Sequence, residues 1–286
     1  MTASKIIAFI LRRLNLKLLD LIAKINNIVI YKKLFNILSF FLMYKIKIVS
    51  IENNVIYLIE KKSAKVLSIC YKNRINYYIN GINFRLNHLA NEYFINKINL
   101  SNNNIVFDIG ANIGEVGVYI NNRFNNEIAY HAFEPSIDEY KVCIKNNEKW
   151  NDNISNIGLW NKPGKMKLYE KNITGDSSLL EIEDYVGFTK IEVDTIDSYV
   201  NRHNIKNIKI LKIEAEGGEP EVLQGAINTL PIIEYITADL GYERGYEKKQ
   251  TLTTVTNFLL LNGFEMVDIN QQRLTVLFKN KLLFNS

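Results

Sequence analysis

The feature that most constrains the fold of this chain is a short apolar segment that ends in a glycine turn. Residues 105–108 are Ile, Val, Phe and Asp, and Gly110 and Gly114 follow. From Val116 to Phe124, apolar residues recur at helical spacing. This order predicts a buried strand, a tight turn and a helix. In that arrangement, backbone N–H groups at the start of the helix face a ligand at the carboxyl end of a sheet.

The spacing of the glycines excludes one common ligand of such turns. The dinucleotide fingerprint requires G-x-G-x-x-G, but its second and third glycine positions hold Asn112 and Glu115 here. The pattern that remains, D-x-G-x-N-x-G, leaves room for a nucleoside and places Asp108 where it could bind a ligand ammonium. Both features suit S-adenosylmethionine. The residues of this turn that we expect to bind the cofactor are Asp108, Gly110, Ala111, Asn112 and Gly114.

A second strand-like segment ends in a carboxylate at a suitable distance from this turn. Residues 128–133 have the pattern of a strand, and Glu134 and Pro135 follow directly. In doubly wound sheets an acidic residue about 20 positions after the glycine turn binds the ribose hydroxyls, and Glu134 lies at this distance from Gly114. Pro135 suits the start of the next helix, where its missing N–H costs nothing. We expect Glu134 and Pro135 to belong to the cofactor site; the alternative for Glu134 is a helix cap.

Strand and helix patterns alternate along the rest of the chain. Predicted strands cover residues 154–159, 165–169, 188–193, 208–213 and 232–238, and predicted helices cover residues 136–150, 195–200, 219–228 and 250–262. This alternation predicts an α/β fold with a mostly parallel sheet covered on both faces. The closing pair of segments, 264–269 and 273–279, predicts one antiparallel strand at the edge of that sheet.

Two segments of different character precede this domain. Residues 1–45 form a basic amphipathic helical extension. Residues 46–86 are rich in β-branched residues and tyrosine, which predicts a small antiparallel meander. Residues 87–286 then make up the main domain. The segments expected to form the meander strands are 54–59, 65–70 and 75–79.

The basic residues are concentrated near the N-terminus. Residues 1–50 hold nine lysines and arginines against the single acid Asp20, a balance of +8, so the rest of the chain carries −3 of the total +5. A basic amphipathic helix such as residues 5–25 can lie on an anionic membrane surface. Its apolar face can equally pack on the main domain or on a second subunit, and both options stay open for residues 5–44. No stretch reaches the roughly 18 uncharged apolar residues of a membrane span.

The cysteines and histidines bear on location and metal content. Cys70 and Cys143 are the only cysteines and lie far apart in the sequence, which argues against a disulfide scaffold and favours a reducing compartment. No signal-peptide pattern is present. We therefore expect a cytoplasmic protein, with peripheral attachment to the inner membrane surface as a further option. Three histidines without a nearby cysteine argue against a zinc site.

Acidic residues follow the strand predicted at 208–213. Glu214 and Glu216 share one side if the strand continues, and both then lie at the carboxyl end of the sheet. Asp239 ends the next predicted strand. Carboxylates so placed cost free energy unless a metal, a cationic ligand or a bound hydroxyl interacts with them. These three residues are the candidate catalytic groups.

At this point the sequence resembles the FkbM family of S-adenosylmethionine-dependent methyltransferases, over roughly residues 100–245. Three positions depart from the family pattern: Glu214 replaces the usual Asp, Ala215 replaces the usual Val, and Leu159-Trp160 replaces a small polar pair. The resemblance implies a Rossmann-like class I methyltransferase sheet and adds Leu159 to the cofactor residues. It rests on four motifs, at Asp108–Gly114, Phe133–Pro135, Thr195–Ser198 and Lys212–Ala226.

The resemblance also implies O-methylation, often of a sugar hydroxyl in a glycan, glycolipid or natural product. A general base must take the hydroxyl proton as the new bond forms, and Glu214, Glu216 and Asp239 are the candidates. An exposed glutamate titrates near ~4.3, so burial or like-charge repulsion must raise the pKa of one of them. Coordination of Mg²⁺ by the same carboxylates is the less favoured reading.

Two other functions are weighed against this one. A nucleic-acid methyltransferase acts on a polyanion, yet residues 208–248 hold eight acids and four bases, a balance of −4, so we expect no nucleic-acid partner. A cofactor-binding scaffold with weak or no turnover is motivated by the changes at Glu214 and Ala215. The expected acceptor is therefore a small molecule or glycan.

Overall fold

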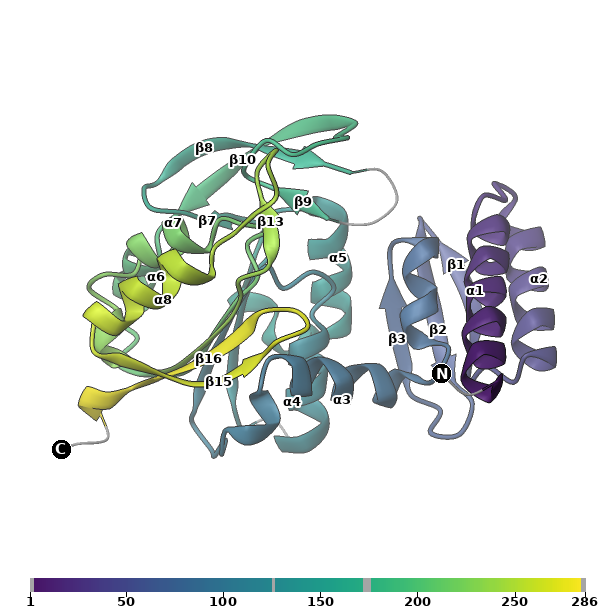
Figure 1. Ribbon diagram of the computed structural model, residues 1–286, viewed down its shortest axis with the longest axis horizontal. Coiled ribbons are helices and arrows are strands. Elements are labelled where there is room, and N and C mark those ends of the chain that lie inside the picture. The colour runs from purple at the N-terminus through teal and green to yellow at the C-terminus, as the bar shows by residue number, and fades with distance from the viewer. Residues whose placement is uncertain (1–2, 125–126, 172–175, 284–286) are drawn as a thin grey trace. The chain divides into compact units, whose positions relative to one another are not determined.

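The computed structural model describes residues 3–124, 127–171 and 176–283, with the backbone alone for residues 3–11. The chain divides into two compact units, Met1–Arg85 and Leu86–Ser286, which are described separately below (Figure 1). No helix within the described residues is long and apolar enough to cross a membrane.

The first unit consists of two helices, a three-stranded antiparallel sheet and a 3-10 helix. The sheet has the order β1-β2-β3, as expected for a meander, but its composition differs from the prediction. The segment 75–79 is not a strand, because Ile75 and Tyr78, three residues apart, are buried together on one side of η1. The elements are α1 (Ala3–Ala23), α2 (Ile28–Phe41), β1 (Ile46–Glu52), β2 (Val55–Glu60), β3 (Val66–Ile69) and η1 (Lys72–Tyr78).

The second unit is built on a seven-stranded sheet with the order β15-β16-β12-β11-β4-β5-β6. The strands are β4 (Ile105–Ile109), β5 (Ala129–Phe133), β6 (Ile154–Ser155), β11 (Ile208–Ile213), β12 (Ile233–Asp239), β15 (Phe264–Asn270) and β16 (Thr275–Asn280). Neighbouring strands from β6 to β12 are parallel, and β16 is antiparallel to both of its neighbours. The predicted mostly parallel sheet with one antiparallel strand is therefore confirmed. The outermost strand is β15, since it pairs on the outer side of β16.

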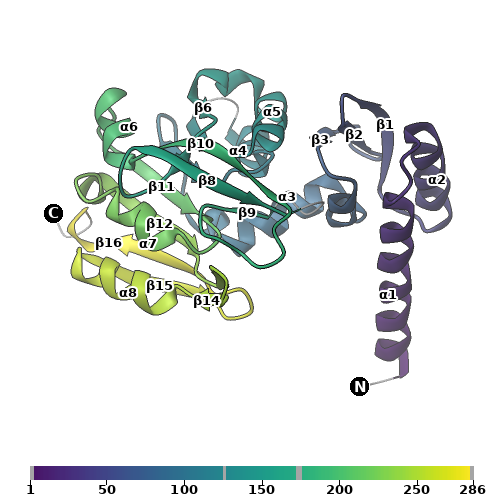
Figure 2. The same ribbon diagram turned by 90° about the horizontal axis from the view of Figure 1, so that it is seen from above.

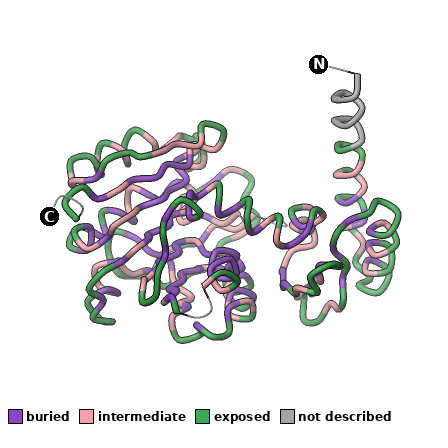
Figure 3. The backbone as a smooth tube through the Cα atoms, turned by 90° about the horizontal axis from the view of Figure 1, so that it is seen from below, coloured by how far each residue is buried: buried purple, intermediate pink, exposed green. Residues whose placement is uncertain are grey.

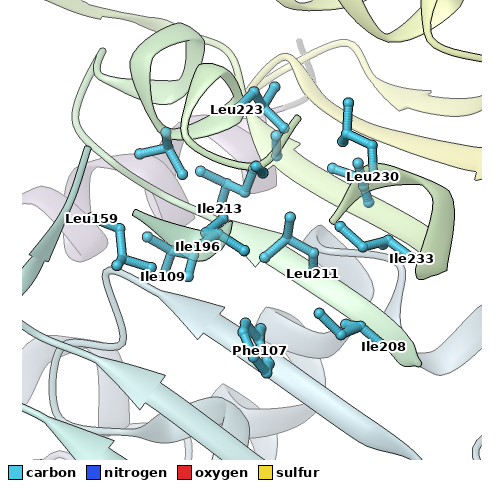
Figure 4. Packing of buried hydrophobic residues seen from close by; sticks show 14 of the residues in the cluster. Phe107, Ile109, Leu159, Ile196, Ile208, Leu211, Ile213, Leu223, Leu230 and Ile233 are labelled. Atoms are coloured by element: carbon cyan, nitrogen blue, oxygen red, sulfur yellow. The ribbon is translucent and has the colours of Figure 1, made fainter. Parts of the chain in front are cut away.

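Helices cover both faces of this sheet, and its strands are largely buried (Figure 3). On one face, Phe107 and Ile109 pack in a single apolar cluster with residues of α6, α7 and α8 (Figure 4). On the other face α4 lies against β5, since a Cβ added at Gly117 would meet the ring of Tyr130 at 2.6 Å. The helices are α3 (Ile82–Glu92), α4 (Glu115–Phe124), α5 (Ile137–Asn146), α6 (Ile196–Arg202), α7 (Glu219–Gln224) and α8 (Leu252–Leu261), with 3-10 turns η2 (Ile95–Lys97), η3 (Glu148–Asn153), η4 (Leu230–Ile232) and η5 (Lys281–Leu283).

Several predicted strands lie outside the main sheet. The predicted strand 154–159 is divided: β6 belongs to the main sheet, and β7 (Gly158–Leu159) pairs with β10 (Gly187–Asp194). β10 also pairs in antiparallel register with β8 (Gly164–Glu170), which pairs with β9 (Ser177–Ser178), in a separate four-stranded sheet. A short hairpin of β13 (Tyr242–Arg244) and β14 (Lys249–Gln250) follows β12. Alternation of strand and helix alone could not separate these segments from the parallel sheet.

The strand order fixes where a ligand can bind. From β4 the chain continues to β5 and β6 on one side, then crosses to β11 on the other side of β4. Open α/β sheets bind ligands at such a reversal, outside the carboxyl ends of the strands. Here that point lies at the carboxyl ends of β4 and β11, where the turn after β4 meets the loop after β11.

Candidate functional site

The turn after β4 and the loop after β11 touch each other directly. The amide of Glu214 donates to the carbonyl of Ile109 at 3.1 Å. Gly110 has a φ of +66°, and a Cβ placed there would lie 1.9 Å from the carbonyl oxygen of Glu214. Only glycine tolerates both this conformation and this approach. Glycine at position 110 is therefore required for two reasons: it forms the turn after β4, and it lets the loop after β11 approach that turn closely.

A buried ion pair holds the base of the turn. Lys212 Nζ lies 3.0 Å from Asp108 Oδ1, and both side chains are almost completely buried. The hydroxyl of Tyr130 donates to the other oxygen of Asp108 at 2.6 Å. Lys212 also donates to the carbonyl of Gly110 at 2.9 Å. Burial raises the pKa of Asp108, and Lys212 opposes this shift.

This arrangement corrects the role expected for Asp108. Its side chain is wholly inside the protein and both carboxylate oxygens have internal partners, so it is not placed to receive a ligand ammonium. The carboxylate instead fixes Lys212, which in turn fixes the turn at Gly110. The strand period explains the difference, since Asp108 points to the face opposite Phe107, where α4 and Tyr130 cover it.

Glu134 lies directly on the glycine turn. One carboxylate oxygen accepts from the amide of Asn112 at 2.7 Å, and the other accepts from the amide of Ser136 at 2.8 Å. The carbonyl of Phe133 accepts from the amides of Gly110 and Ala111 at 3.0 and 3.1 Å. The proximity expected between this carboxylate and the turn is therefore present. The bond to Ser136 also joins Glu134 to the start of α5, as the helix-cap alternative expected.

The remaining predicted cofactor residues surround this turn. Gly114 has a φ of +77°, and a Cβ there would meet the side chain of Asn147 at 2.1 Å. The carbonyl of Pro135 accepts from the side chain of Asn156 at 3.0 Å. Leu159, at the carboxyl end of β7, is buried in the same apolar cluster as Ile109. Its side chain thus packs beneath the site.

Glu214 is held by two cations. Its carboxylate oxygens lie 3.2 Å from Lys212 Nζ and 3.4 Å from Arg273 Nη2. Burial raises the pKa of Glu214, but Lys212 and Arg273 more than offset this and hold the pKa at about 2. A carboxylate that remains ionised down to such a pH is a weak proton acceptor. Of the three candidate bases, Glu214 is the one whose surroundings fit that role least.

Arg273 also forms an ion pair with Asp239. Its Nε and Nη2 donate to one oxygen of Asp239 at 3.0 and 2.6 Å, and the other oxygen accepts from the amide of Gly241 at 3.1 Å. Burial raises the pKa of Asp239, Arg273 lowers it and the nearby Glu214 raises it. Sequence reasoning missed Arg273, which lies in the turn between β15 and β16 and carries no local signal of a role at a site almost sixty residues from Glu214 in sequence.

The loop that carries Glu216 is braced by side chains from two elements, α7 and β13. Glu219 accepts from the amides of Ala215 and Gly217 at 3.0 and 3.1 Å. Arg244 donates to the carbonyl of Gly217 at 2.6 Å and forms a two-pronged ion pair with Glu221. Glu219 and Glu221, which favour the positive end of α7, therefore also shape this loop. Glu216 itself has a φ of +48°, a strained conformation that such bracing maintains.

Glu216 and Glu243 form a pair of carboxylates with raised pKa values. Burial raises the pKa of Glu216 well above its ordinary value, and Glu243 and then Glu214 raise it further. Burial also raises the pKa of Glu243 to about 8, with Asp239 and Glu214 adding to the shift. Glu243 lies on β13, beside Arg244 of the loop brace. Sequence reasoning missed Glu243, because only the packing of β13 on the loop at Gly217 brings it here.

Among the described residues, no group of three or more histidine, cysteine or acidic side chains is arranged to hold a metal ion. The carboxylates of Asp108, Glu214 and Asp239 form ion pairs inside the protein. Lys212 pairs with Asp108 and Glu214, and Arg273 pairs with Glu214 and Asp239.

The strand order, the glycine turn and the carboxylate at the end of β5 together define a class I methyltransferase fold. A family model described as the methyltransferase FkbM domain matches residues 108–266, which is more than half of the chain. The chain therefore belongs to the FkbM methyltransferase family, whose members depend on S-adenosylmethionine, and the resemblance seen in the sequence is confirmed. A search of curated proteins finds no match.

Solved structures of methyltransferases are similar to this chain. Methyltransferase FkbM from Methylobacillus flagellatus KT shares 15% identity and a TM-score of 0.45, and the match covers 73% of this chain and 54% of that one. This chain thus spans about half the length of that protein. Precorrin-6y C5,15-methyltransferase from Geobacter metallireducens GS-15 shares 13% identity and a TM-score of 0.36, covering 64% and 82%. The N-terminal domain of human METTL16 in complex with SAH shares 14% identity and a TM-score of 0.37, covering 70% of each chain.

Proposed function

We propose that this protein transfers the methyl group of S-adenosylmethionine to a hydroxyl group, most readily that of a sugar in a glycan, glycolipid or natural product. The observation that carries the proposal is the pair of carboxylates Glu216 and Glu243, on the loop that contacts the glycine turn and on the strand β13 packed against that loop. Its raised pKa values are those that a general base for a hydroxyl requires. Family membership supports a hydroxyl group as the methyl acceptor.

The residues around the turn fit the cofactor. The carboxylate of Glu134 accepts backbone N–H groups from the glycine turn and from the start of α5. These bonds hold it at the carboxyl end of β5, where doubly wound sheets present an acidic residue to a ribose diol. The backbone at Gly110, Ala111 and Asn112 would lie beside the nucleoside. When bound, S-adenosylmethionine supplies a methyl group on a positively charged sulfur.

The side chains after β11 and β13 would receive the acceptor. We assign Glu216 and Glu243 the task of taking the hydroxyl proton as the acceptor oxygen gains the methyl group; the electron pair of the broken carbon–sulfur bond would stay on the sulfur of the donor, which leaves as a neutral thioether. Because the charge of Glu243 raises the pKa of Glu216, we expect the two carboxylates to accept this proton as a pair. Glu214 and Asp239, held by Lys212 and Arg273, would position the site rather than accept protons. The partly exposed Glu216 can afterwards pass the proton to solvent.

Two competing functions are less well supported. A polyanionic nucleic acid would meet the acidic segment 208–248, whose charge is −4. A cofactor-binding scaffold would have no need for the raised pKa values of Glu216 and Glu243. Both become outcomes of the experiment below.

The test compares Glu216→Gln with Glu247→Gln, since Glu247 is an exposed glutamate on the same hairpin region. Methyl transfer from labelled S-adenosylmethionine to a panel of sugars, glycans and RNA is measured, and cofactor binding is followed by calorimetry. We expect Glu216→Gln to lose about 10²–10⁴-fold in turnover with unchanged cofactor affinity, and Glu247→Gln to match the wild type. Full turnover in Glu216→Gln would remove the base assignment. Binding without transfer to any acceptor would favour the scaffold, and transfer to RNA alone would favour the nucleic-acid enzyme.

A further inference from the structure

The first unit is strongly basic. Residues 1–85 contain 15 lysines and arginines against three acids, a charge of +12, so residues 86–286 carry −7 of the total +5. The family match lies wholly within the second unit. The excess of positive charge therefore belongs to a different unit from the proposed catalytic edge.

Helix α2 is fixed to the sheet of this unit through its polar side. It lies beside β1, the open edge of the sheet (Figures 1 and 2). Asn36 donates to the carbonyl of Ile48 at 2.9 Å and accepts from its amide at 2.8 Å. The side chains of Lys32 and Ser39 donate to the carbonyls of Val49 and Ile46. The polar residues that interrupt the apolar helix thus satisfy the backbone of an edge strand.

Two aromatic residues complete this attachment. Tyr31 and Phe35 lie on the same side of α2 as the polar row and are fully buried. Together with the polar row, these two rings attach the inner side of α2 to the rest of the unit.

The opposite side of α2 is apolar and exposed. Its members recur at helical spacing, and Phe40 and Phe41 each expose 74% of their surface. The exposure continues beyond the helix to Met43, at 85%. A contiguous exposed apolar patch of this kind marks an interaction surface. We name it the α2 apolar face; it consists of Ile30, Leu34, Ile37, Phe40, Phe41, Leu42 and Met43.

Exposed lysines lie near the end of α2 that carries the two phenylalanines and on the helix itself. Lys61 Nζ donates to the carbonyl of Ser39 at 3.0 Å, and the amide of Lys61 donates to the carbonyl of Lys45 at 2.8 Å. Burial lowers the pKa of Lys61, and the charge of Lys47 lowers it further, which shows that these cations share one small region. Lys33, also exposed, lies on the outward side of α2 itself.

We propose that the α2 apolar face docks on an anionic lipid bilayer, with Phe40, Phe41 and Met43 inserted among the acyl chains and Lys33, Lys45 and Lys61 bonded to lipid phosphates. Exposed large apolar side chains and adjacent cations on one helix are the two features that interfacial membrane binding requires. The long lysine stems can lie along the apolar surface while their ammonium groups reach the headgroups.

Other occupants fit these residues less well. A second copy of the chain would bring the same basic unit, at +12, against itself, which like-charge repulsion opposes. A nucleic acid would be bound by cations and stacking platforms, whereas aliphatic residues and methionine make up most of the α2 apolar face.

The experiment is flotation of the full chain with vesicles of phosphatidylcholine, with and without phosphatidylglycerol. We expect the protein to float with the anionic vesicles only, and to be released as ionic strength rises. Phe40→Ser/Phe41→Ser should weaken partitioning at least roughly tenfold. Lys33→Gln/Lys45→Gln should weaken it roughly 30-fold on anionic vesicles, the factor expected for two lysines near the surface.

The matched control is Leu260→Ser/Leu261→Ser, which removes two adjacent exposed apolar residues from α8 of the second unit. It should float as the wild type does. Circular dichroism of each variant checks folding, which these exposed positions should not disturb. Three results would overturn the proposal: no flotation on anionic vesicles, flotation unchanged in the Phe40→Ser/Phe41→Ser variant, or a dimer or RNA complex that this variant alone abolishes.

Discussion

At the scale of single residues, the site is governed by which carboxylates have a cation beside them. Glu214 and Asp239 both contact Arg273, whereas burial and then the charges of nearby acids raise the pKa values of Glu216 and Glu243. The sequence predicted the acidic edge and required a raised pKa there. It could not say which residue meets that requirement, because Arg273 and Glu243 arrive from elements distant in sequence.

The carboxylate pair predicts the pH dependence of methyl transfer. The base must be deprotonated, so kcat/KM should rise as the pH increases through the titration of the pair, where Glu243 has a pKa of about 8. In Glu243→Gln the repulsion on Glu216 is removed, so the pKa of Glu216 falls and the rise should move to lower pH. Rate profiles of the two proteins measure this shift. An identical profile in both would show that the pair does not control the reaction.

The buried pair of Lys212 and Asp108 predicts a large stability effect. In Lys212→Met the carboxylate of Asp108, which has no exposed surface, loses its cation, and unfolding free energy should fall by about 3–5 kcal/mol. The pKa of Asp108 is already raised by burial and rises further in the variant, so the folded state binds the extra proton. The loss should therefore shrink as pH falls through that pKa.

Urea titrations at neutral and acidic pH measure the effect. The double variant Asp108→Asn/Lys212→Met removes the buried charge and should recover part of the loss. A double variant no more stable than Lys212→Met would contradict the electrostatic explanation.

At the scale of elements, the strand–turn–helix around Gly110 is the part of the fold that sequence predicted best. Its strand, positive-φ turn and helix are all dictated by neighbouring residues. The segment 75–79 was predicted wrongly as a strand, since tyrosine and isoleucine are common to strands and to buried 3-10 turns. The strands β8 and β10 were both predicted. That they pair in a separate sheet depends on long-range contacts that no local pattern encodes.

The contact between Gly110 and the β11 loop predicts a specific cost for a methyl group. Gly110→Ala meets the carbonyl of Glu214 in a conformation that alanine disfavours, so we expect a loss of about 1–3 kcal/mol in unfolding free energy together with weaker cofactor binding. Gly187→Ala on β10 is the control, because a Cβ there meets nothing within 4 Å. Thermal unfolding and calorimetry compare the two variants. Equal behaviour would show that the two loops can separate freely.

At the scale of the whole molecule, charge and chemistry are divided between two units. The first unit holds the positive charge and the α2 apolar face, and the second holds the family domain. Phe40→Ser/Phe41→Ser should therefore leave cofactor affinity in solution unchanged while it weakens vesicle binding. Calorimetry without lipid measures the first quantity. Loss of cofactor binding in this variant would contradict the independence of the two units.

The interlocking of the two loops at Gly110 has a consequence for kinetics. The glycine turn cannot shift without carrying the backbone of Glu214, and Lys212 bonds to both. Occupation of the turn by the methyl donor should therefore rigidify the loop that receives the acceptor. We expect an ordered sequential reaction in which the donor enters first and the spent donor leaves last.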